Sequence, residues 1–439
     1  MLESPRKRYL SGSDWVIAAL DHQLRSTTSA GNTCQVGLLL DGQLDQDLFR
    51  RELRRFTCRF PVLQGRVRRD LRLTPYWSIP PGLREDIPVQ VSRIADLTRS
   101  GELLALLSHA ADIPFRDERE HLAFHIVDDG RRSALVMRFD HRLFDARGAE
   151  SFLDSFRLSL GQEDLPSTPI SFRSSAELSH WNRKFRAGRN VNRRIIALSR
   201  STPLSLPLPP GRDRGFGYRL LCFDRHETDA IFHRADHMAG YLMESSFFLA
   251  AITASLHGLF VSRSAPGESY LVPVTTDLGS ARGVERELFF NHSSYLFYQV
   301  PAQLAGDMVA LVALFKQQMY DQIKSGFPRD LAEATLLSRI APLPLMGKLM
   351  HLPLEGKLAS YVFSHVGRSS FLGTEFMGCR VDNILHLPRV PAPPGLGVFG
   401  CLYDGRLTLT IAHLDGLLEQ GELDLLEAAI RRNMGAEPS

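Results

Sequence analysis

The stretch Met137-Arg138-Phe139-Asp140-His141-Arg142-Leu143-Phe144-Asp145-Ala146-Arg147-Gly148 decides how this sequence is interpreted. Apolar side chains alternate at Leu135, Met137 and Phe139, which is the period of a β-strand with one face toward a core. His141 continues this row where the apolar run ends, and Asp145 follows four residues later. A histidine in that position can act as a general base. The His-x-x-x-Asp spacing also arises by chance, and the alternative is a histidine that only packs at a strand end.

The segments around this stretch predict a hairpin followed by a helix. Residues 121–127 and 133–139 have strand-like composition and flank the turn Asp128-Asp129-Gly130, which is typical of a β-hairpin. Residues 148–160 carry large apolar side chains at a spacing of four, which predicts an amphipathic helix. His141 is therefore expected in the loop of a strand–loop–helix unit.

The rest of the chain alternates between strand-like and helix-like segments. Residues 46–56 have a helical period that ends before Pro61. Residues 162–214 are rich in Pro, Ser and Arg and are expected to form the crossover between two lobes. Further strands are predicted at residues 218–223, 270–275, 292–300, 360–366, 398–403 and 406–413, and further helices at residues 226–238, 244–263 and 419–434. Both halves mix strands and helices.

Composition narrows the class of protein. The chain has 439 residues, 44% of them hydrophobic and 23% charged, which is ordinary for a soluble protein with two or three cores. The net charge of +3 gives no electrostatic case for nucleic acid. No signal peptide is readable, and the apolar residues 246–261 predict a buried helix and no membrane span. The five cysteines have no metal-binding spacing, so we expect a cytoplasmic protein without a metal.

Several segments, in order, resemble the superfamily of chloramphenicol acetyltransferase, nonribosomal peptide condensation domains, plant alcohol acyltransferases and bacterial wax-ester synthases. Residues 140–148 are similar to the His-His-x-x-x-Asp-Gly motif of that superfamily, and the similarity spans nearly the whole chain. The other matching segments are Asp41-Gly42-Gln43-Leu44-Asp45 through Phe60-Pro61-Val62-Leu63, Leu271-Val272-Pro273-Val274, Phe290-Asn291-His292-Ser293, Tyr361-Val362-Phe363-Ser364-His365-Val366-Gly367, Gly395-Leu396-Gly397-Val398 and Tyr403-Asp404-Gly405-Arg406-Leu407.

The resemblance implies a mixed α/β fold of two chloramphenicol acetyltransferase-like lobes that form a V with a central tunnel. The implied division is an N-terminal lobe at residues 1–165, a linker at 166–214 and a C-terminal lobe at 215–439. The segments at residues 361–367, 395–398 and 403–407 resemble the C-terminal strands that cross between the lobes. A thioester donor and an acceptor would enter from opposite mouths. The implied co-substrate is acyl-CoA or a phosphopantetheinyl thioester, with no bound cofactor. The implied protein is a monomer that takes a small-molecule acceptor and possible acyl or peptidyl carrier proteins.

The resemblance also assigns roles to residues. His141 would be the general base, Asp145 would orient the motif loop by pairing with an arginine such as Arg282 or Arg147, and Ser364 would donate to the oxyanion. The residues expected to contact substrate are Asp140, Phe144, Gly148, Asn291 and His365. The resulting hypothesis is a stand-alone acyltransferase that makes an ester or an amide.

Departures from the superfamily pattern keep a second hypothesis open. Asp140 stands where the superfamily has its first histidine, which a catalytic member tolerates because the second histidine is the base. Ala146 stands where the superfamily has the closing glycine, and Thr275, Thr276 and Asp277 stand after Pro273 where relatives often carry an arginine. The missing glycine and arginine motivate the second hypothesis. The chain would then be a catalytically silent, condensation-like domain that binds a carrier protein or another partner. The basic residues 183–200 could guide an acidic carrier or the phosphates of coenzyme A, but a solvated linker is the simpler interpretation.

Overall fold

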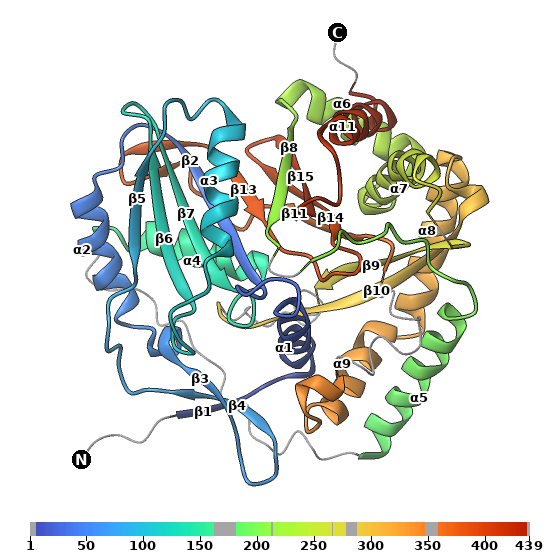
Figure 1. Cartoon of the computed structure of the whole chain (residues 1–439), viewed down its shortest axis with the longest axis horizontal. Coiled ribbons are helices and arrows are strands. Elements are labelled where there is room, and N and C mark those ends of the chain that lie inside the picture. The colour runs from blue at the N-terminus through green and yellow to red at the C-terminus, as the bar shows by residue number, and fades with distance from the viewer. Residues whose placement is uncertain are drawn as a thin grey trace.

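The computed structural model describes residues 6–161, 181–211, 214–265, 267–277, 288–346 and 359–436. Within these residues, two six-stranded mixed sheets stand side by side and define two lobes, with helices on their faces (Figure 1). This is the two-lobed α/β architecture that the resemblance implies, and solved structures with the same fold are described below.

The first lobe is built on the sheet that carries the motif strand. Its strand order is β12-β13-β2-β7-β6-β5. The strands are β2 (Thr33–Asp41), β5 (Val89–Arg93), β6 (Leu122–Asp128), β7 (Ser133–Asp140), β12 (Glu375–Phe376) and β13 (Cys379–Leu387). The predicted hairpin is present, because β6 and β7 pair antiparallel from Leu122 opposite Phe139 to Asp128 opposite Ser133. The motif strand β7 therefore lies near the middle of the sheet and ends at Asp140.

One strand of this sheet comes from the last third of the chain. Strand β13 pairs antiparallel with β2, and its orange ribbon stands beside the blue and teal strands in Figure 1. The three segments expected to cross, at residues 361–367, 395–398 and 403–407, instead belong to the second sheet. The prediction of which segment crosses was therefore wrong, because strand composition does not reveal which sheet a strand joins.

Helices cover both faces of the first sheet. Helix α3 (Ser100–Asp112) packs on the face that carries Ala134 and Val136. Helices α2 (Gln46–Thr57) and α4 (Ala146–Ser159) pack on the other face, where phenylalanine rings form the core. In that core, Phe156 stacks on Phe56 with 5.0 Å between ring centroids. Helix α4 is the helix predicted after the motif, and its start is fixed to this core.

The second lobe holds the sheet β10-β9-β11-β14-β15-β8. Its strands are β8 (Phe216–Cys222), β9 (Ser269–Asp277), β10 (Ser293–Pro301), β11 (Val362–Arg368), β14 (Leu396–Tyr403) and β15 (Arg406–Leu414), and its helices include α6 (Arg225–Ala239), α7 (Glu244–Ser262), α8 (Met308–Lys324) and α11 (Gln420–Met434). Helix α7 is long and apolar enough to cross a bilayer, but 67% of its apolar window is buried. It supplies much of this lobe's core, as its composition predicts.

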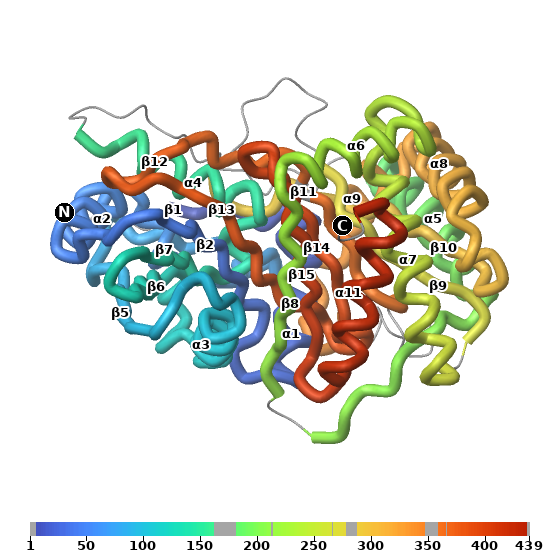
Figure 2. Tube along the Cα trace, turned by 90° about the horizontal axis from the view of Figure 1, so that it is seen from above, coloured from blue at the N-terminus to red at the C-terminus, as the bar shows by residue number. Residues whose placement is uncertain are grey.

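Smaller elements join the two lobes. A three-stranded sheet of β1 (Arg6–Tyr9), β4 (Pro75–Ile79) and β3 (Arg66–Arg69) lies beside the first lobe. The central helix α1 (Gly12–Leu24) packs on α9 (Phe327–Ser338) so closely that a Cβ at Gly12 would lie 2.4 Å from the Ala332 carbonyl oxygen. Figure 2 shows the same two lobes from above, with α1 between them.

Part of the predicted linker is helical. Helix α5 (Trp181–Leu198) packs on α9 at the outer side of the second lobe (Figure 1). Its buried residues recur every three to seven positions, at Lys184, Ala187, Val191 and Leu198. This helical period was missed because the surrounding arginines indicated a solvated segment. About the first third of the predicted segment 162–214, residues 162–180, lies outside the described residues.

The aromatic core under α4 yields a stability prediction. Phe152 is fully buried between Phe56, Phe60 and Phe144. Phe152→Ala should lower the free energy of unfolding by about 3 to 5 kcal/mol, because it leaves a cavity that the rings cannot fill. The control Leu425→Ala, at an exposed position, should change it by less than about 0.5 kcal/mol. Urea denaturation measures both, and equal effects would contradict this description of the core.

Candidate functional site

His141 lies in a turn directly after β7. Its backbone is held from two sides, because its N–H donates to the Asn32 carbonyl oxygen at 3.1 Å and its own carbonyl accepts from Asn291 Nδ2 at 3.0 Å. The residue is partly exposed. Its Nδ1 is buried and has no hydrogen-bond partner among the described residues. The imidazole is thus positioned through its backbone.

Asp145 begins helix α4 and ties the motif loop together. Its Oδ1 accepts the Gly148 N–H at 2.8 Å as an N-cap, and its Oδ2 accepts the His292 N–H at 3.1 Å. The side chain is buried, with 4% exposed. This placement fits a structural role in shaping the loop. Two arginines were named as possible partners of Asp145. Arg147 is the second residue of α4, and Arg282 lies outside the described residues.

A segment from the other half of the chain closes over the motif loop. We call residues 288–292 the clamp segment. Its Phe290 N–H donates to the Leu143 carbonyl oxygen at 2.6 Å, and its next two residues make the Asn291 and His292 bonds given above. A Cβ at Gly148 would lie 2.8 Å from the Leu288 carbonyl oxygen, so glycine permits this close approach. The predicted residue Gly148 therefore lies directly against the clamp segment, and Asn291 of the clamp segment binds the motif loop.

The clamp segment is held in turn by a buried ion pair. Arg8 Nη1 donates to Asp14 Oδ2 at 2.7 Å, and both side chains are 1% exposed. Asp14 Oδ1 accepts the Asn291 N–H at 3.1 Å, and the Arg8 guanidinium stacks 3.4 Å from the centre of the Phe290 ring. Phe290 has a φ of +77°, a strained conformation for this residue type. The Arg8–Asp14 ion pair therefore fixes the backbone of Phe290 and Asn291, and the Asn291 side chain binds the His141 carbonyl oxygen.

Asp140 is the centre of a second buried charge network. Its carboxylate accepts from Arg142 Nη2 at 2.5 Å and from His121 Nδ1 at 3.0 Å, while His121 Nε2 faces the Gly65 carbonyl oxygen at 2.8 Å. Burial raises the pKa of Asp140, but Arg142 and His121 outweigh that effect and hold the pKa below its usual range. Both carboxylate oxygens are thus occupied by protein groups, although Asp140 was expected to contact substrate.

The network also reaches the other support of His141. Arg142 Nε lies 3.8 Å from Asp21 Oδ2, and Asp21 Oδ1 accepts the Asn32 N–H at 2.9 Å. Asn32 is the residue whose carbonyl binds the His141 N–H. Asp140 and Asp21 therefore support the loop on one side of His141, and the clamp segment supports it on the other.

The remaining predicted site residues lie further out. Phe144 is fully buried in the aromatic core of the first lobe. On β11 of the second lobe, Ser364 Oγ lies 2.6 Å from Thr275 Oγ1, and both side chains are partly exposed. The His365 ring lies 4.8 Å from the Phe248 ring, and burial, with a smaller effect of Arg147, lowers the pKa of His365 to about 4. The motif residue Arg147 lies beside β11, since a Cβ at Gly367 would lie 3.7 Å from Arg147 Nη2.

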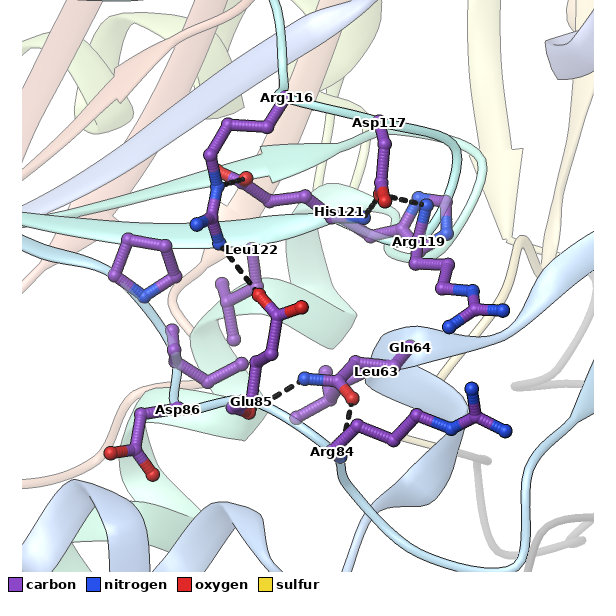
Figure 3. A pocket seen from close by; sticks show the side chains of 13 residues that line it. Leu63, Gln64, Arg84, Glu85, Asp86, Arg116, Asp117, Arg119, His121 and Leu122 are labelled. Atoms are coloured by element: carbon purple, nitrogen blue, oxygen red, sulfur yellow. Dashed lines mark hydrogen bonds and ion pairs between the residues drawn. The ribbon is translucent and has the colours of Figure 1, made fainter.

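His141 lines neither of the two described pockets. The larger, of about 220 Å³, is lined by His121 and by charged side chains such as Arg116 and Glu85 (Figure 3). Arg116 pairs with Glu85 at 3.4 Å and also with Glu120, so the walls are largely paired with one another. The smaller pocket, of about 100 Å³, lies beside His125. The tunnel between the lobes stays a prediction.

Sequence analysis missed the residues that support His141, namely Arg8, Asp14, Asp21, Asn32 and His121. They lie between 20 and 133 positions from His141, and no local spacing connects them to it. The sequence did point to the clamp segment, because the resemblance includes Phe290-Asn291-His292-Ser293. It did not indicate that this segment contacts the motif loop.

The buried ion pair makes stability depend on pH. Burial raises the pKa of Asp14, but Arg8 and backbone N–H donors outweigh this effect and lower it to about 2. Because the pKa is lower in the folded state, about 2 kcal/mol of stability is present above pH 4 and is lost as the pH falls toward 2. In urea denaturation from pH 5 to pH 2, Asp14→Asn should lose less stability than the wild type. The control Asp229→Asn, at an exposed position, should lose as much stability as the wild type over this pH range. If Asp14→Asn lost as much as the wild type, the proposed contribution of Asp14 would be contradicted.

Comparison with known proteins gives a match by structure alone. No protein-family model matches the chain, and no curated protein matches it in sequence. Trichothecene 15-O-acetyltransferase from Fusarium sporotrichioides matches with a TM-score of 0.69 at 13% identity, covering 98% of this chain and 95% of that one. The first condensation domain of the calcium-dependent antibiotic synthetase matches with a TM-score of 0.72 at 15% identity, covering 98% and 97%.

A third match comes from a different type of domain. The epimerization domain of the third module of tyrocidine synthetase B has a TM-score of 0.64 at 12% identity, covering 99% of this chain and 97% of that one. The matches span almost the full length of every chain, so they include both lobes. The fold implied by the resemblance is confirmed: this chain has the two-lobed fold shared by acetyltransferases and by condensation and epimerization domains.

Proposed function

We propose that this protein is an acyltransferase that uses His141 as its general base. The donor is the thioester of coenzyme A or of a carrier-protein phosphopantetheine, and the acceptor is a hydroxyl or an amine. The observation that carries the proposal is the placement of His141, because its backbone is bound on both sides while the residue stays partly exposed. A residue that only packs at a strand end does not need two dedicated supports.

The proposed reaction needs one proton carrier. The imidazole of His141 takes the proton from the acceptor O–H or N–H as that atom attacks the thioester carbonyl carbon. The carbonyl oxygen becomes the oxyanion, the C–S bond then breaks, and the departing thiolate receives the proton. The products are a free thiol and an ester or an amide. No covalent bond to the protein forms.

The second lobe offers donors for the oxyanion. Ser364 and Thr275 present two hydroxyl groups 2.6 Å apart on neighbouring strands β11 and β9. When one hydroxyl donates to the other, the second O–H is available to a developing negative charge, and such a donor typically contributes about 10²- to 10³-fold in rate. His365, on the same strand, has a lowered pKa and stays neutral near pH 7, so it adds no charge there.

The proposal extends to partners and location. The donor thioester is a co-substrate, and the protein needs no bound cofactor for the transfer step. A carrier protein is a candidate donor because the structural matches include domains of peptide synthetases. We propose that the enzyme acts as a monomer in the cytoplasm.

A silent condensation-like domain is the alternative function. The features that favour it are the missing glycine, replaced by Ala146, and the missing arginine after Pro273, where Thr275, Thr276 and Asp277 stand. Asp140 contacts His121 and Arg142 and so helps to hold the motif loop. Support of this kind is compatible with a catalytic loop as well as with a silent one. A panel of acyl thioesters and acceptors separates the two functions, because any product that depends on His141 excludes the silent one.

His141 provides the direct test of the proposed function. His141→Ala should lower kcat by about 10²- to 10⁴-fold, because the acceptor then loses its base. The matched control is His233→Ala, which removes an exposed histidine from α6 and should leave kcat unchanged. Circular dichroism checks that both variants are folded. Full activity in folded His141→Ala would reject His141 as the base.

A further inference from the structure

Three metal-ligating side chains meet at the junction of the two lobes. Glu150 belongs to α4 of the first lobe, His386 to the crossing strand β13 and Cys401 to β14 of the second lobe. Glu150 Oε1 lies 2.8 Å from His386 Nε2 and 3.5 Å from Cys401 Sγ. Their exposed fractions are 0%, 8% and 5%. The proposed acyl transfer uses none of them.

The buried charge of Glu150 needs an explanation. Burial raises its pKa, but His386 and backbone and hydroxyl donors near Ser370 outweigh that effect, so the carboxylate stays ionised. Within the described residues, no lysine or arginine forms an ion pair with it. A buried carboxylate is costly unless a cation or a metal compensates it. The groups that face the Glu150 carboxylate here are the His386 imidazole and the Cys401 thiol.

The three groups have the chemistry and spacing of a zinc site. Carboxylate oxygen, imidazole nitrogen and thiolate sulfur are the usual ligands of Zn²⁺, at bond lengths of about 2.0 to 2.3 Å in a tetrahedron. Such bonds place a ligand oxygen about 3.3 Å from a ligand nitrogen and about 3.5 Å from a ligand sulfur. The measured oxygen–sulfur distance of 3.5 Å fits, and the oxygen–nitrogen distance of 2.8 Å must open by about 0.5 Å. The Ser370 N–H donates to Glu150 Oε2 at 2.6 Å, and this outer contact orients the carboxylate.

We propose that Glu150, His386 and Cys401 bind one Zn²⁺ ion, with water as the fourth ligand. Binding deprotonates the Cys401 thiol, so the Cys401 thiolate and the Glu150 carboxylate together neutralise the ion. The metal joins α4 to β13 and β14. Because α4 starts at Asp145, the site fixes the helix that carries the motif loop to the second lobe.

The sequence predicted no metal because these ligands are far apart in the chain. Glu150, His386 and Cys401 are separated by more than 200 positions on one side and by 15 on the other, and neither spacing belongs to a known zinc motif. Only the crossing of β13 into the first sheet brings them together.

Titration of the whole protein with metal tests the proposal. After removal of metals by a chelator, Co²⁺ should bind one ion per chain and give a sulfur-to-cobalt charge-transfer band, and Zn²⁺ should displace it. Cys401→Ser should abolish the band and weaken Zn²⁺ binding by more than about 10- to 100-fold, the usual effect of losing only an outer contact. The control is Cys379→Ser, which removes another buried cysteine and should bind like the wild type.

A second variant and a stability measurement keep the test decisive. His386→Gln should also lose the cobalt band, and Zn²⁺ should raise the Tm of the wild type but of neither ligand variant. Absence of stoichiometric Co²⁺ or Zn²⁺ binding to the wild type overturns the proposal, whether or not the variants fold. Equal binding by the wild type, Cys401→Ser and His386→Gln overturns it as well. None of these results depends on acyltransferase activity.

Discussion

The contact between the clamp segment, residues 288–292, and the motif loop is the constraint on which the rest of the site depends. Backbone and amide groups of the clamp segment bind the carbonyl oxygens of Leu143 and His141 and the carboxylate of Asp145. Each bond is short-range and directional, so the loop and the clamp segment fix one another. A site formed in this way requires both halves of the chain to fold before His141 is positioned.

Buried charges hold this contact in place. The Arg8–Asp14 pair binds the clamp segment, and the Asp140 network binds the loop from the other side. Removing one partner of a buried pair leaves an uncompensated charge and typically costs about 3 to 5 kcal/mol. A wholly apolar substitute would avoid that risk, but it would not supply the acceptors that the Asn291 and Asn32 amides need. We attribute the buried Arg8–Asp14 pair and the Asp140 network to the need to hold the backbone around His141 in one geometry.

Local features of the fold were predictable from the sequence, whereas long-range pairings were not. The β6–β7 hairpin has alternating residues and a Gly130 turn, and α4 has phenylalanines on one face, so both were predicted within about two residues. The crossing of β13 and the helix α5 were not predicted, because pairing depends on distant partners and because arginines obscured the helical period of α5. His141 and Asp145 came from a motif. Arg8, Asp14 and His121 are recognisable only in three dimensions.

The central claim is that His141 presents its ring to an acceptor beside a thioester. A crystal structure of the protein with a stable thioether analogue of an acyl thioester and an acceptor alcohol tests it most directly. The account predicts the acceptor oxygen within hydrogen-bond distance of the His141 ring, about 3 Å, with the acyl carbonyl group next to it. A complex in which the analogue binds elsewhere, or in which packed side chains separate it from His141, would contradict the account.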